Sequence, residues 1–375
     1  MKKIAVNTRL LRKNAMDGIG WVTYNALKEI TVNHPEVEFH FLFDSGIEDE
    51  FLFSKNIVPH NLFPPAKHAL LNMMWFEWSA KSLLRRLKPD LFFSPDGILC
   101  LGWNGKQYGI IHDINYEHRP KDLKPTNRLY YKYFIPRSAE KACRLATVSE
   151  YSKKDIVNTY KINPNKIDVV HLGINKFFNA IDSEKQKQKI KDKYTNGFDY
   201  FIFIGTLHPR KNIIRLMQAF NLFKDETKSN FKLILAGKEM YRTSELHQLK
   251  ANLINGNDII FTGRLPDAEL AELLAASFCM IFIPLFEGFG LPPIEAMECN
   301  VPVIASNVTS IPEVVSDAGL LVNPYNIEEI KNSIVKIYKN DNLRQSLIEK
   351  GKTRSGFFRW ENTATLLWDS ISKCF

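Results

Sequence analysis

Two successive series of short apolar runs, separated by amphipathic segments, constrain the fold of this 375-residue chain more than any other feature. The runs of the first series begin at Lys2, Val37, Leu91, Tyr108 and Arg144. The runs of the second series begin at Asp199, Phe231, Ile259, Cys279 and Val301. Strands that alternate with helices form parallel sheets covered on both faces. We therefore expect an α/β protein of two tandem doubly wound, Rossmann-like domains, whose ligand-binding edges face one cleft.

The segment DSEKQKQKIKDKY, from Asp182, lies between the two series and is rich in charge but poor in apolar residues. This composition is typical of an interdomain connection, and it fits equally well a solvated first helix of the second domain. We predict a first domain over residues 1–180 and a second domain that begins at residue 181.

Basic residues concentrate in the first of these domains. Residues 1–180 hold 26 Lys and Arg against 18 Asp and Glu, a formal charge of +8, whereas the remainder holds 24 against 23, a charge of +1. A one-sided positive field favours nucleic acid, an anionic membrane or phosphorylated ligands as partners. Because no recognised DNA- or RNA-binding motif accompanies the charge, we expect no nucleic-acid partner.

The sequence also bears on the compartment. No apolar run approaches the ~18–20 residues of a spanning helix, and Asn7 and Arg9 interrupt the first run too early for a secretory signal. The five cysteines show neither a CxxC pair nor a metal-ligand spacing. We therefore expect a cytoplasmic protein, at most peripheral at the inner face of the membrane, with unpaired packing cysteines and no metal or cofactor.

The segment IPLFEGFGLPPIEAMECNVPVIAS, from Ile283, combines features of an anion site and a polyol site. A strand is followed by Gly288 and Gly290, and Pro292 and Pro293 then begin a helix near Ile294. Glycines let a backbone approach a ligand, and the N–H groups of a first helical turn attract anions. Glu287 and Glu295 flank this turn, and carboxylates accept hydrogen bonds from sugar hydroxyls. A nucleoside diphosphate sugar, with an anionic centre between two polyols, fits this arrangement. Alternatively, Glu295 complements only the helix N-terminus and Glu287 faces solvent.

A second segment, FIGTLHPRKN from Phe203, places two cations after a strand. Gly205 and Thr206 end the strand, and Arg210 and Lys211 precede the next helix. Two cations at the carboxyl end of a strand can clamp a diphosphate, although such a dipeptide also occurs on ordinary surface loops.

A third segment, YGIIHDINYEHRP from Tyr108, ends a first-domain strand with His112 and Asp113. A histidine there can donate a hydrogen bond to a sugar hydroxyl or carry a proton. A purely structural role for His112 fits the same pattern.

These segments together resemble the retaining glycosyltransferases of family 4, which have the glycosyltransferase-B fold. EGFGLPPIE is similar to the family's two-glutamate signature, in which seven residues separate the glutamates, and GTLHPRKN is similar to its phosphate clamp. MDGIGWVTYN, IHDINYEHRP, ATVSEYSKKDI and VVHLGIN resemble, in order, further family segments. The resemblance covers nearly the whole chain, and FFRWENTATLLWDSI resembles the terminal helix that packs back on the first domain, so residues 358–375 are assigned there and the second domain ends at residue 357.

The resemblance implies an acceptor-binding first domain, a donor-binding second domain and a role for each matching residue. Glu287 would bind the hydroxyls of the transferred sugar and Glu295 the ribose, Arg210 and Lys211 would hold the diphosphate, and His112 would touch the sugar from the first domain. Further donor-binding positions would be Gly18, Gly20, Gly205, Thr206, Gly288, Phe289, Gly290 and Leu291. Such enzymes retain anomeric configuration and generally need no bound metal.

One departure concerns the clamp. Relatives often carry arginine directly after the glycine at position 205, where this chain has Thr206. Either Arg210 or Arg264, in FTGRLP, would supply the missing charge.

The resemblance is to the mannosyltransferase-like branch, which favours transfer of mannose from GDP-mannose to a growing surface polysaccharide or a lipid-linked acceptor. A UDP-sugar donor and a sugar-nucleotide epimerase of related fold remain alternatives. A dinucleotide-dependent oxidoreductase is disfavoured, because GIGWVT lies about ten residues beyond the first strand and has threonine in place of the third glycine.

The segment from Pro64 to Asp90 combines apolar, aromatic and basic residues. An amphipathic helix of this composition can lie on an anionic bilayer and present a lipid-linked acceptor. The same residues also fit an ordinary domain helix buried against the sheet.

Overall fold

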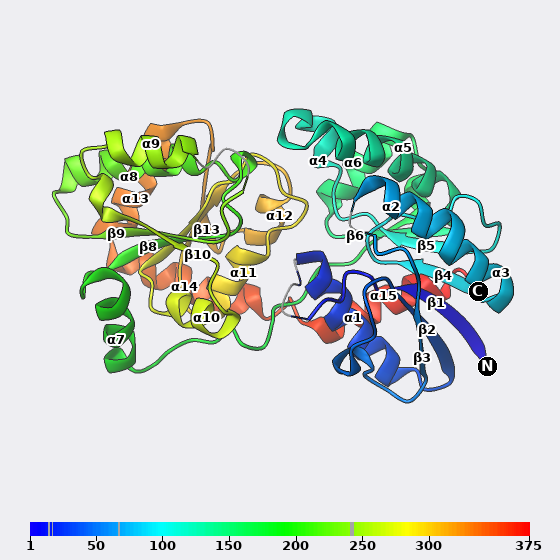
Figure 1. Cartoon of the computed structure of the whole chain (residues 1–375). Helices are drawn as coiled ribbons and strands as arrows, with labels where there is room; N and C mark the ends of the chain where they lie inside the picture. The colour runs from blue at the N-terminus through cyan, green and yellow to red at the C-terminus, as the bar shows by residue number, and fades with distance from the viewer. Residues whose placement is uncertain (14–15, 17, 67, 241–243) are drawn as a thin grey trace. The chain divides into compact units, whose positions relative to one another are not determined.

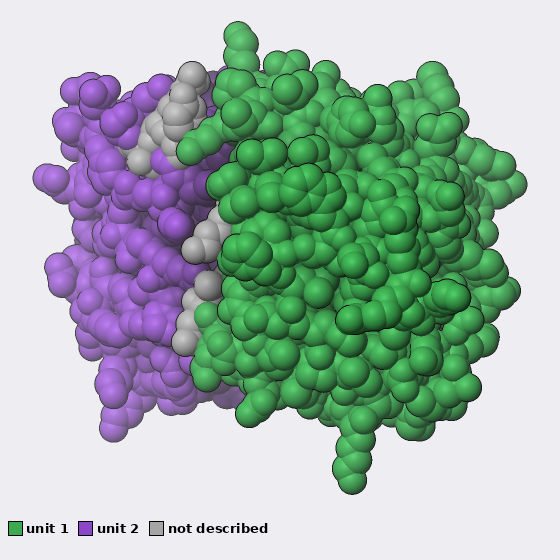
Figure 2. Space-filling view, turned by 45° about the vertical axis from the view of Figure 1, so that its right-hand side comes forward, with its two compact units in different colours: residues 1–173, 359–375 green, residues 174–358 purple. Residues whose placement is uncertain are grey.

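The computed structural model describes residues 1–13, 16, 18–66, 68–240 and 244–375. The chain forms two compact units, residues 1–173 with 359–375 (unit 1) and residues 174–358 (unit 2), which Figure 2 shows in green and purple. Residues 174–180 thus group with unit 2, whereas the sequence pattern places them in the first domain.

The described part of unit 1 contains a seven-stranded parallel sheet in the order β3-β2-β1-β4-β5-β6-β7. Its strands are β1 (Lys2–Asn7), β2 (Val37–Phe43), β3 (Ile57–Asn61), β4 (Leu91–Ser94), β5 (Gln107–Ile110), β6 (Arg144–Thr147) and β7 (Ile167–Val169). The central strands are almost continuously apolar and buried, as expected of a parallel sheet covered on both faces.

Helices cover both faces of this sheet (Figure 1). On one face, α1 (Gly18–Asn33) packs beside α15 (Trp360–Ser372). The other helical segments are α2 (Ala69–Met74), η2 (Trp75–Ala80, a π-helix), α3 (Lys81–Leu87), α4 (Asn115–His118), α5 (Pro125–Lys141) and α6 (Glu150–Tyr160), with the short 3₁₀ turns η1 (Asp49–Phe51), η3 (Pro120–Asp122) and η4 (Pro164–Lys166). Within the predicted amphipathic segment of residues 64–90, α2, η2 and α3 follow one another without a break and form one α–π–α run over residues 69–87.

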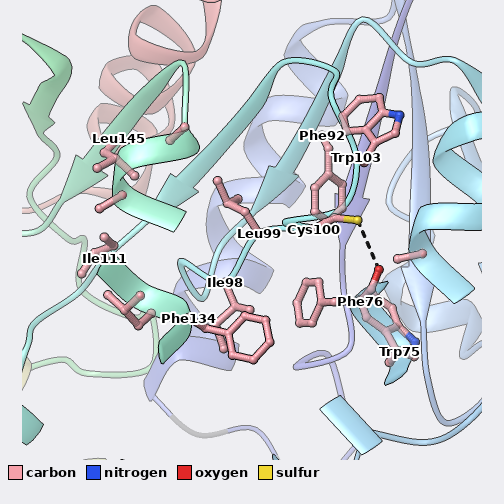
Figure 3. Packing of buried hydrophobic residues seen from close by; sticks show 14 of the residues in the cluster. Trp75, Phe76, Phe92, Ile98, Leu99, Cys100, Trp103, Ile111, Phe134 and Leu145 are labelled. Carbon is pink, nitrogen blue, oxygen red and sulfur yellow. Dashed lines mark hydrogen bonds between the residues drawn. The ribbon is translucent and has the colours of Figure 1, made fainter. Parts of the chain in front are cut away.

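A large aromatic cluster lies between the α2–η2–α3 segment and the sheet (Figure 3). Trp75 and Phe76 are fully buried, and the Cys100 thiol donates to the Phe76 carbonyl oxygen at 3.2 Å. Leu83 and Leu84 of α3 are buried as well. The side of the segment that carries Trp75, Leu83 and Leu84 is thus part of the core, as expected of an ordinary domain helix.

The C-terminal helix α15 belongs to unit 1. The hydroxyl of Tyr108 on β5 donates to Ser370 Oγ at 2.7 Å, and a disulfide joins Cys143 to Cys374. The expectation that all cysteines are unpaired is therefore wrong for these two, because α15 returns across 231 residues of sequence and brings Cys374 to the start of β6. Cys100, Cys279 and Cys299 are free and buried.

The described part of unit 2 contains a six-stranded parallel sheet in the order β10-β9-β8-β11-β12-β13. Its strands are β8 (Tyr200–Ile204), β9 (Lys232–Ala236), β10 (Ile259–Gly263), β11 (Cys279–Phe282), β12 (Val303–Ser306) and β13 (Gly319–Val322). The helices are α7 (Glu184–Thr195), α8 (Ile213–Thr227), α9 (Ser244–Asn252), α10 (Asp267–Ala275), α11 (Leu291–Glu298), α12 (Ile311–Val315), α13 (Ile327–Lys339) and α14 (Asp341–Ser355), with η5 (Pro209–Lys211) and η6 (Gly256–Asp258).

In unit 2, α8, α9 and α13 lie on one face of the sheet, and α10, α11 and α14 lie on the other (Figure 1). The expected α/β fold with two doubly wound parallel sheets is confirmed. The strand order reverses between β1 and β4 in unit 1 and between β8 and β11 in unit 2. Such a reversal opens a crevice at the carboxyl ends of the two strands, where ligands bind in this class of fold.

No helix among the described residues is long and apolar enough to cross a lipid bilayer.

Candidate functional site

The two conspicuous segments of the second half meet at the strand reversal of unit 2. β8 and β11 are hydrogen-bonded neighbours, so the loops that follow them, with Arg210 and Lys211 on one and Glu287 on the other, lie side by side. The backbone N–H of Leu285 donates to the carbonyl oxygen of Arg210 at 2.8 Å, which fixes the two loops to each other.

The first loop is held in place by its own sequence. His208 Nδ1 accepts a hydrogen bond from the backbone N–H of Arg210 at 3.3 Å, and Pro209 begins the 3₁₀ turn η5. Asn212 adopts a left-handed conformation (φ 64°), which asparagine tolerates better than most residues. Its amide donates to the carbonyl oxygens of Ile283 (3.1 Å) and Pro324 (2.7 Å). Asn212 thus fixes the direction in which the two cations point.

Glu287 lies between the two cations. Its Oε1 atom is 2.9 Å from Nη1 of Arg210 and pairs directly with Nζ of Lys211. Glu287 and Lys211 are 8% and 7% exposed. Nη1 of Arg210 also donates to the Phe286 carbonyl oxygen at 3.2 Å. Two positive groups therefore converge on one carboxylate in a buried place, and the trio keeps a formal charge of +1.

The electrostatics of Glu287 follow from this geometry. Burial alone raises the pKa of its carboxyl group, but the charges and hydrogen bonds of Arg210 and Lys211 outweigh burial, and the net pKa is lowered. Glu287 is therefore an ionised acceptor of hydrogen bonds at neutral pH.

The loop after Glu287 is shaped by glycine and by Ser310. Gly290 precedes α11 with φ 111°, and a Cβ atom there would lie 2.6 Å from Cδ1 of Ile311, so a larger residue would be both strained and in collision. The Ser310 hydroxyl lies within hydrogen-bonding distance of the carbonyl oxygens of Glu287 (2.9 Å) and Phe289 (2.8 Å). These contacts define the path of the backbone from Glu287 to Leu291, where α11 begins.

Gly237 secures the β8 side of the site. It follows β9 with φ 153°, and a Cβ atom there would lie only 1.9 Å from the carbonyl oxygen of Gly205. The backbones at the ends of β8 and β9 can approach so closely only because this residue has no side chain.

Glu295 lies in the first half of α11 and is 7% exposed. Burial raises its pKa to about 8, and the negative charge of Asp267 adds to the shift. In contrast to Glu287, Glu295 is therefore mostly protonated at pH 7, so that it can both donate and accept hydrogen bonds.

The structure brings some of the predicted site residues together and leaves others apart. Arg210, Lys211 and Glu287 form one cluster, and Gly288, Phe289, Gly290 and Leu291 continue from it into α11. Thr206 follows β8, and Arg264 follows β10; both side chains are exposed. Of the two candidates for the missing clamp arginine, Arg210 forms an ion pair with Glu287, with Nη1 and Oε1 2.9 Å apart.

The other predicted residues belong to unit 1. Gly18 begins α1, and Gly20 is buried where a Cβ atom would lie 2.9 Å from the Leu10 carbonyl oxygen. His112 is half-buried after β5, and its Nε2 donates to the Pro95 carbonyl oxygen at 2.9 Å. Asp17, part of the predicted glycine loop, and Lys67, part of the predicted amphipathic helix, lie outside the described residues.

Sequence reasoning missed the residues that support the site. Asn212 stands inside the quoted motif HPRKN, and an asparagine directly before a helix is a usable signal for a turn. Ser310 and Gly237 are recognisable only from the fold, because their partners are 21 to 32 residues away in sequence.

No group of three or more His, Cys, Asp or Glu side chains suited to a metal ion occurs among the residues that the structure covers. The cluster of Arg210, Lys211 and Glu287 instead offers donors for an anion beside an acceptor for hydroxyl groups.

Comparison with protein families gives matches to both halves of the chain. Residues 16–176 match the family described as glycosyltransferase family 4, and residues 182–354 match the family described as glycosyl transferases group 1.

Among curated relatives, O-antigen chain mannosyltransferase B of Escherichia coli is 34% identical over 259 residues, which cover 68% of this chain and 67% of the relative. The serotype-specific mannosyltransferase WbdA of Escherichia coli is 28% identical over 237 residues, which cover 62% of this chain but only 29% of that protein. The chain therefore spans about two thirds of the first relative and less than a third of the second.

Among solved structures, sucrose-phosphate synthase from Thermosynechococcus elongatus superimposes with a TM-score of 0.80 at 17% identity, covering 100% of this chain and 99% of the other. Alr3699/HepE of Anabaena, solved in complex with UDP and glucose, has a TM-score of 0.76 at 17% identity, with 99% of each chain covered. At these identities the likeness concerns the fold.

The raised pKa of Glu295 predicts a pH-dependent stability. The folded protein binds this proton more tightly than the unfolded chain, whose glutamate pKa is about 4.3. The contribution of this protonated carboxyl group to the free energy of unfolding is thus fully present below about pH 4. It is lost as the pH rises towards and through about 8. The neutral isostere Glu295→Gln cannot ionise at this position, so its stability should not fall in this way. We therefore expect the melting temperature of Glu295→Gln, relative to that of the wild type, to rise between pH 5 and pH 8.

Thermal unfolding at several pH values measures this difference, and Glu298→Gln on the same helix is the matched control. A melting-temperature difference between Glu295→Gln and the wild type that stays constant across this range would contradict the assignment.

Proposed function

Because this chain belongs to glycosyltransferase family 4, we propose that it is a retaining enzyme that transfers a hexose from a nucleoside diphosphate sugar to a hydroxyl group of a growing surface glycan or lipid-linked acceptor. The observation that carries the proposal is the buried cluster of Arg210, Lys211 and Glu287 at the strand reversal of unit 2.

The charge balance of the cluster supports a diphosphate ligand. Two cations face one carboxylate, and the remaining positive charge lies in a buried place where attraction to an anion is screened little by water. In this proposal Lys211 and Arg210 hold the diphosphate, and Arg210 supplies the charge that relatives obtain from an arginine at the position of Thr206. Arg264 is exposed and has the lesser role.

The two glutamates suit the two carbohydrate parts of the donor. Glu287 is ionised and accepts hydrogen bonds from hydroxyl groups of the transferred hexose. Glu295 carries a proton at neutral pH and can exchange donor and acceptor roles with the ribose hydroxyls. His112 would contact the transferred sugar, as the family resemblance implies.

The proposed reaction needs no covalent intermediate on the protein. The bond between the anomeric carbon and the diphosphate oxygen breaks, and the acceptor hydroxyl attacks from the same face. Its proton passes to the departing phosphate oxygen. Lys211 and Arg210 stabilise the negative charge that develops on the diphosphate, which is the kind of preorganised electrostatic contribution that dominates many enzymatic rate enhancements.

The names of the relatives support mannose as the transferred sugar and GDP-mannose as the donor. Both curated relatives described above are mannosyltransferases, and one is named for the O-antigen chain. We therefore propose a role in building a mannose-containing O-antigen or a comparable surface polysaccharide. A UDP-sugar is the alternative donor, supported by the structural likeness to HepE, which was solved with UDP and glucose.

Unit 1 exposes apolar side chains that support contact with an anionic membrane. Phe63, Leu70, Met73 and Trp78, here called the 63–78 patch, are between 39% and 80% exposed. The neighbouring helix α5 packs against α2. Residues 119–141, which include α5, hold seven Lys and Arg against two Asp and Glu. Apolar groups that enter a headgroup region beside basic groups bind anionic lipid surfaces. We propose that this surface brings the enzyme to lipid-linked acceptors.

The first prediction of the proposal concerns turnover. Replacing Lys211 with alanine should lower kcat for transfer from GDP-mannose by roughly two orders of magnitude, because each preorganised charge at a departing group contributes about 3–4 kcal/mol. Steady-state kinetics with radiolabelled GDP-mannose measures the effect, and Lys336→Ala on the exposed side of α13 is the control. A loss of less than about threefold in Lys211→Ala would remove this lysine from the donor site.

The second prediction concerns the membrane. In cosedimentation with phosphatidylglycerol vesicles at low salt, the wild type should sediment and should be released as salt is raised, because the basic groups are exposed to screening. The double variant Leu70→Ser/Trp78→Ser should partition roughly tenfold less, since two large apolar side chains no longer enter the headgroup region. Ile254→Ser, which removes an exposed apolar side chain from unit 2, should behave as the wild type. Absence of wild-type cosedimentation at low salt would refute membrane contact.

A further inference from the structure

A third loop of unit 2 reaches the cluster of Arg210, Lys211 and Glu287. It comprises residues 307–310 and connects β12 to α12. β12 is the hydrogen-bonded neighbour of β11, so the loop after β12 lies beside the loop that carries Glu287. Parallel strands bring such loops to the same edge of a sheet, where ligands bind in this class of fold.

Thr309 and Ser310 in this loop hold the Glu287 peptide from two sides. Oγ1 of Thr309 accepts a hydrogen bond from the backbone N–H of Glu287 at 3.3 Å. The Ser310 hydroxyl lies 2.9 Å from the carbonyl oxygen of Glu287. Arg210 and Lys211 hold the carboxylate of the same residue from the loop after β8. Both backbone polar groups of Glu287 and one of its carboxylate oxygens are therefore fixed by neighbouring loops.

The two hydroxyl groups are directed at the Glu287 loop. Thr309 donates its single hydroxyl proton to the carbonyl oxygen of Val308 at 2.7 Å, so towards Glu287 it acts as an acceptor. Ser310 stands at the N-cap of α12, where a serine hydroxyl commonly accepts from the first turn of its own helix. Within the described residues it instead faces the carbonyl oxygens of Glu287 and Phe289. Neither hydroxyl is thus explained by a need of α12.

The backbone of Thr309 lies in the left-handed region, with φ 58°. Eight described residues other than glycine have positive φ, and Thr309 is the one among them with a branched Cβ atom. Four of the others directly follow helices, where this conformation is common, namely Lys88, Lys161, Asn196 and Lys228. A β-branched residue is a conformational outlier at such an angle, and outliers of this kind persist where the surroundings or the function require them.

Stability and the contact with Glu287 make opposite demands at position 309. Glycine adopts a positive φ without steric cost, but it has no hydroxyl group to accept from the N–H of Glu287. Threonine supplies the acceptor and strains the backbone. The residue present is therefore the one that keeps Glu287 in place, at the expense of local stability.

We propose that Thr309 is a positioning residue for sugar transfer, whose hydroxyl group sets the place of Glu287 against the transferred hexose. This inference rests on the proposed function, because it concerns the glutamate that binds the hexose there. Thr309 acts through Glu287, so its effect should appear with ligands that carry the hexose and not with the nucleoside diphosphate alone.

Three variants of Thr309 separate the hydroxyl group from the backbone strain. Thr309→Ser keeps the hydroxyl, Thr309→Val keeps the branched Cβ atom without it, and Thr309→Gly removes both the hydroxyl and the strain. The melting temperature of Thr309→Gly should be higher than that of Thr309→Val, because glycine alone is unstrained at this φ. Activity should follow the hydroxyl group instead, with Thr309→Ser above both other variants.

Steady-state kinetics of the full chain with GDP-mannose measures this order. In Thr309→Val and Thr309→Gly, kcat/KM should fall about tenfold, because a hydrogen bond is lost and the carboxylate is placed less accurately. Thr309→Ser should restore most of the wild-type value, and the Kd for GDP, which has no hexose, should stay unchanged in all three variants. UDP-glucose and UDP are measured in parallel as the alternative pair.

Thr353→Val on α14 is the matched control, since it makes the same chemical change at an exposed hydroxyl that donates to the carbonyl oxygen of Glu349. It should behave as the wild type. A kcat/KM of Thr309→Val equal to that of the wild type would overturn the proposal. So would activities of the three variants that follow their melting temperatures, with Thr309→Gly at or above Thr309→Ser.

Hydrogen–deuterium exchange resolved to the Glu287 amide tests the positioning without any ligand. Exchange should be faster in Thr309→Val than in the wild type, because the amide loses its acceptor, and it should be unchanged in Thr309→Ser and Thr353→Val. Equal exchange in Thr309→Val and the wild type would overturn the assignment. Failure of the wild type to bind any sugar nucleotide would instead defeat the proposed function, while the exchange result would still report whether Thr309 holds Glu287.

Discussion

The pairing of Glu287 with Lys211 and Arg210 is the interaction on which the arrangement of unit 2 depends. Taking a carboxylate out of water is costly unless opposite charges and hydrogen bonds replace the lost solvation. Two cations on the loop after β8 do so, and they also tie that loop to the one after β11. A buried ion pair is weak evidence for stability by itself. This cluster, however, lies at the strand reversal, where ligands bind in this class of fold, and it carries one positive charge in excess, which suits an anionic ligand.

The comparison of the two units extends this argument. In both, a basic residue that follows the first central strand reaches an acidic residue that follows the strand on the other side of the reversal. Parallel strands bring their carboxyl ends to the same edge, so residues distant in sequence meet there.

The sequence was sufficient to predict the sheets and the segments of the donor site, because central strands are short apolar runs and functional residues directly follow them. It did not reveal β3, β7 and β13, which lie at sheet edges and are only partly buried, so that their apolar pattern is weak. Nor did it reveal the pairing of Arg9 with Asp96, 87 residues apart, because only the strand order brings them together. The same holds for Cys143 and Cys374, since spacing along the chain carries no information on a helix that returns to the first sheet.

The central claim is that a sugar nucleotide binds where Lys211, Arg210 and Glu287 meet. Hydrogen–deuterium exchange of the full chain with and without GDP-mannose tests it most directly, because it locates a ligand on the backbone without relying on turnover. We expect slower amide exchange in Arg210–Lys211 and from Gly288 to the first turn of α11, and little change in the α13–α14 region. Unchanged exchange in both segments at saturating GDP-mannose and UDP-glucose, or protection confined to other parts of unit 2, would contradict the account.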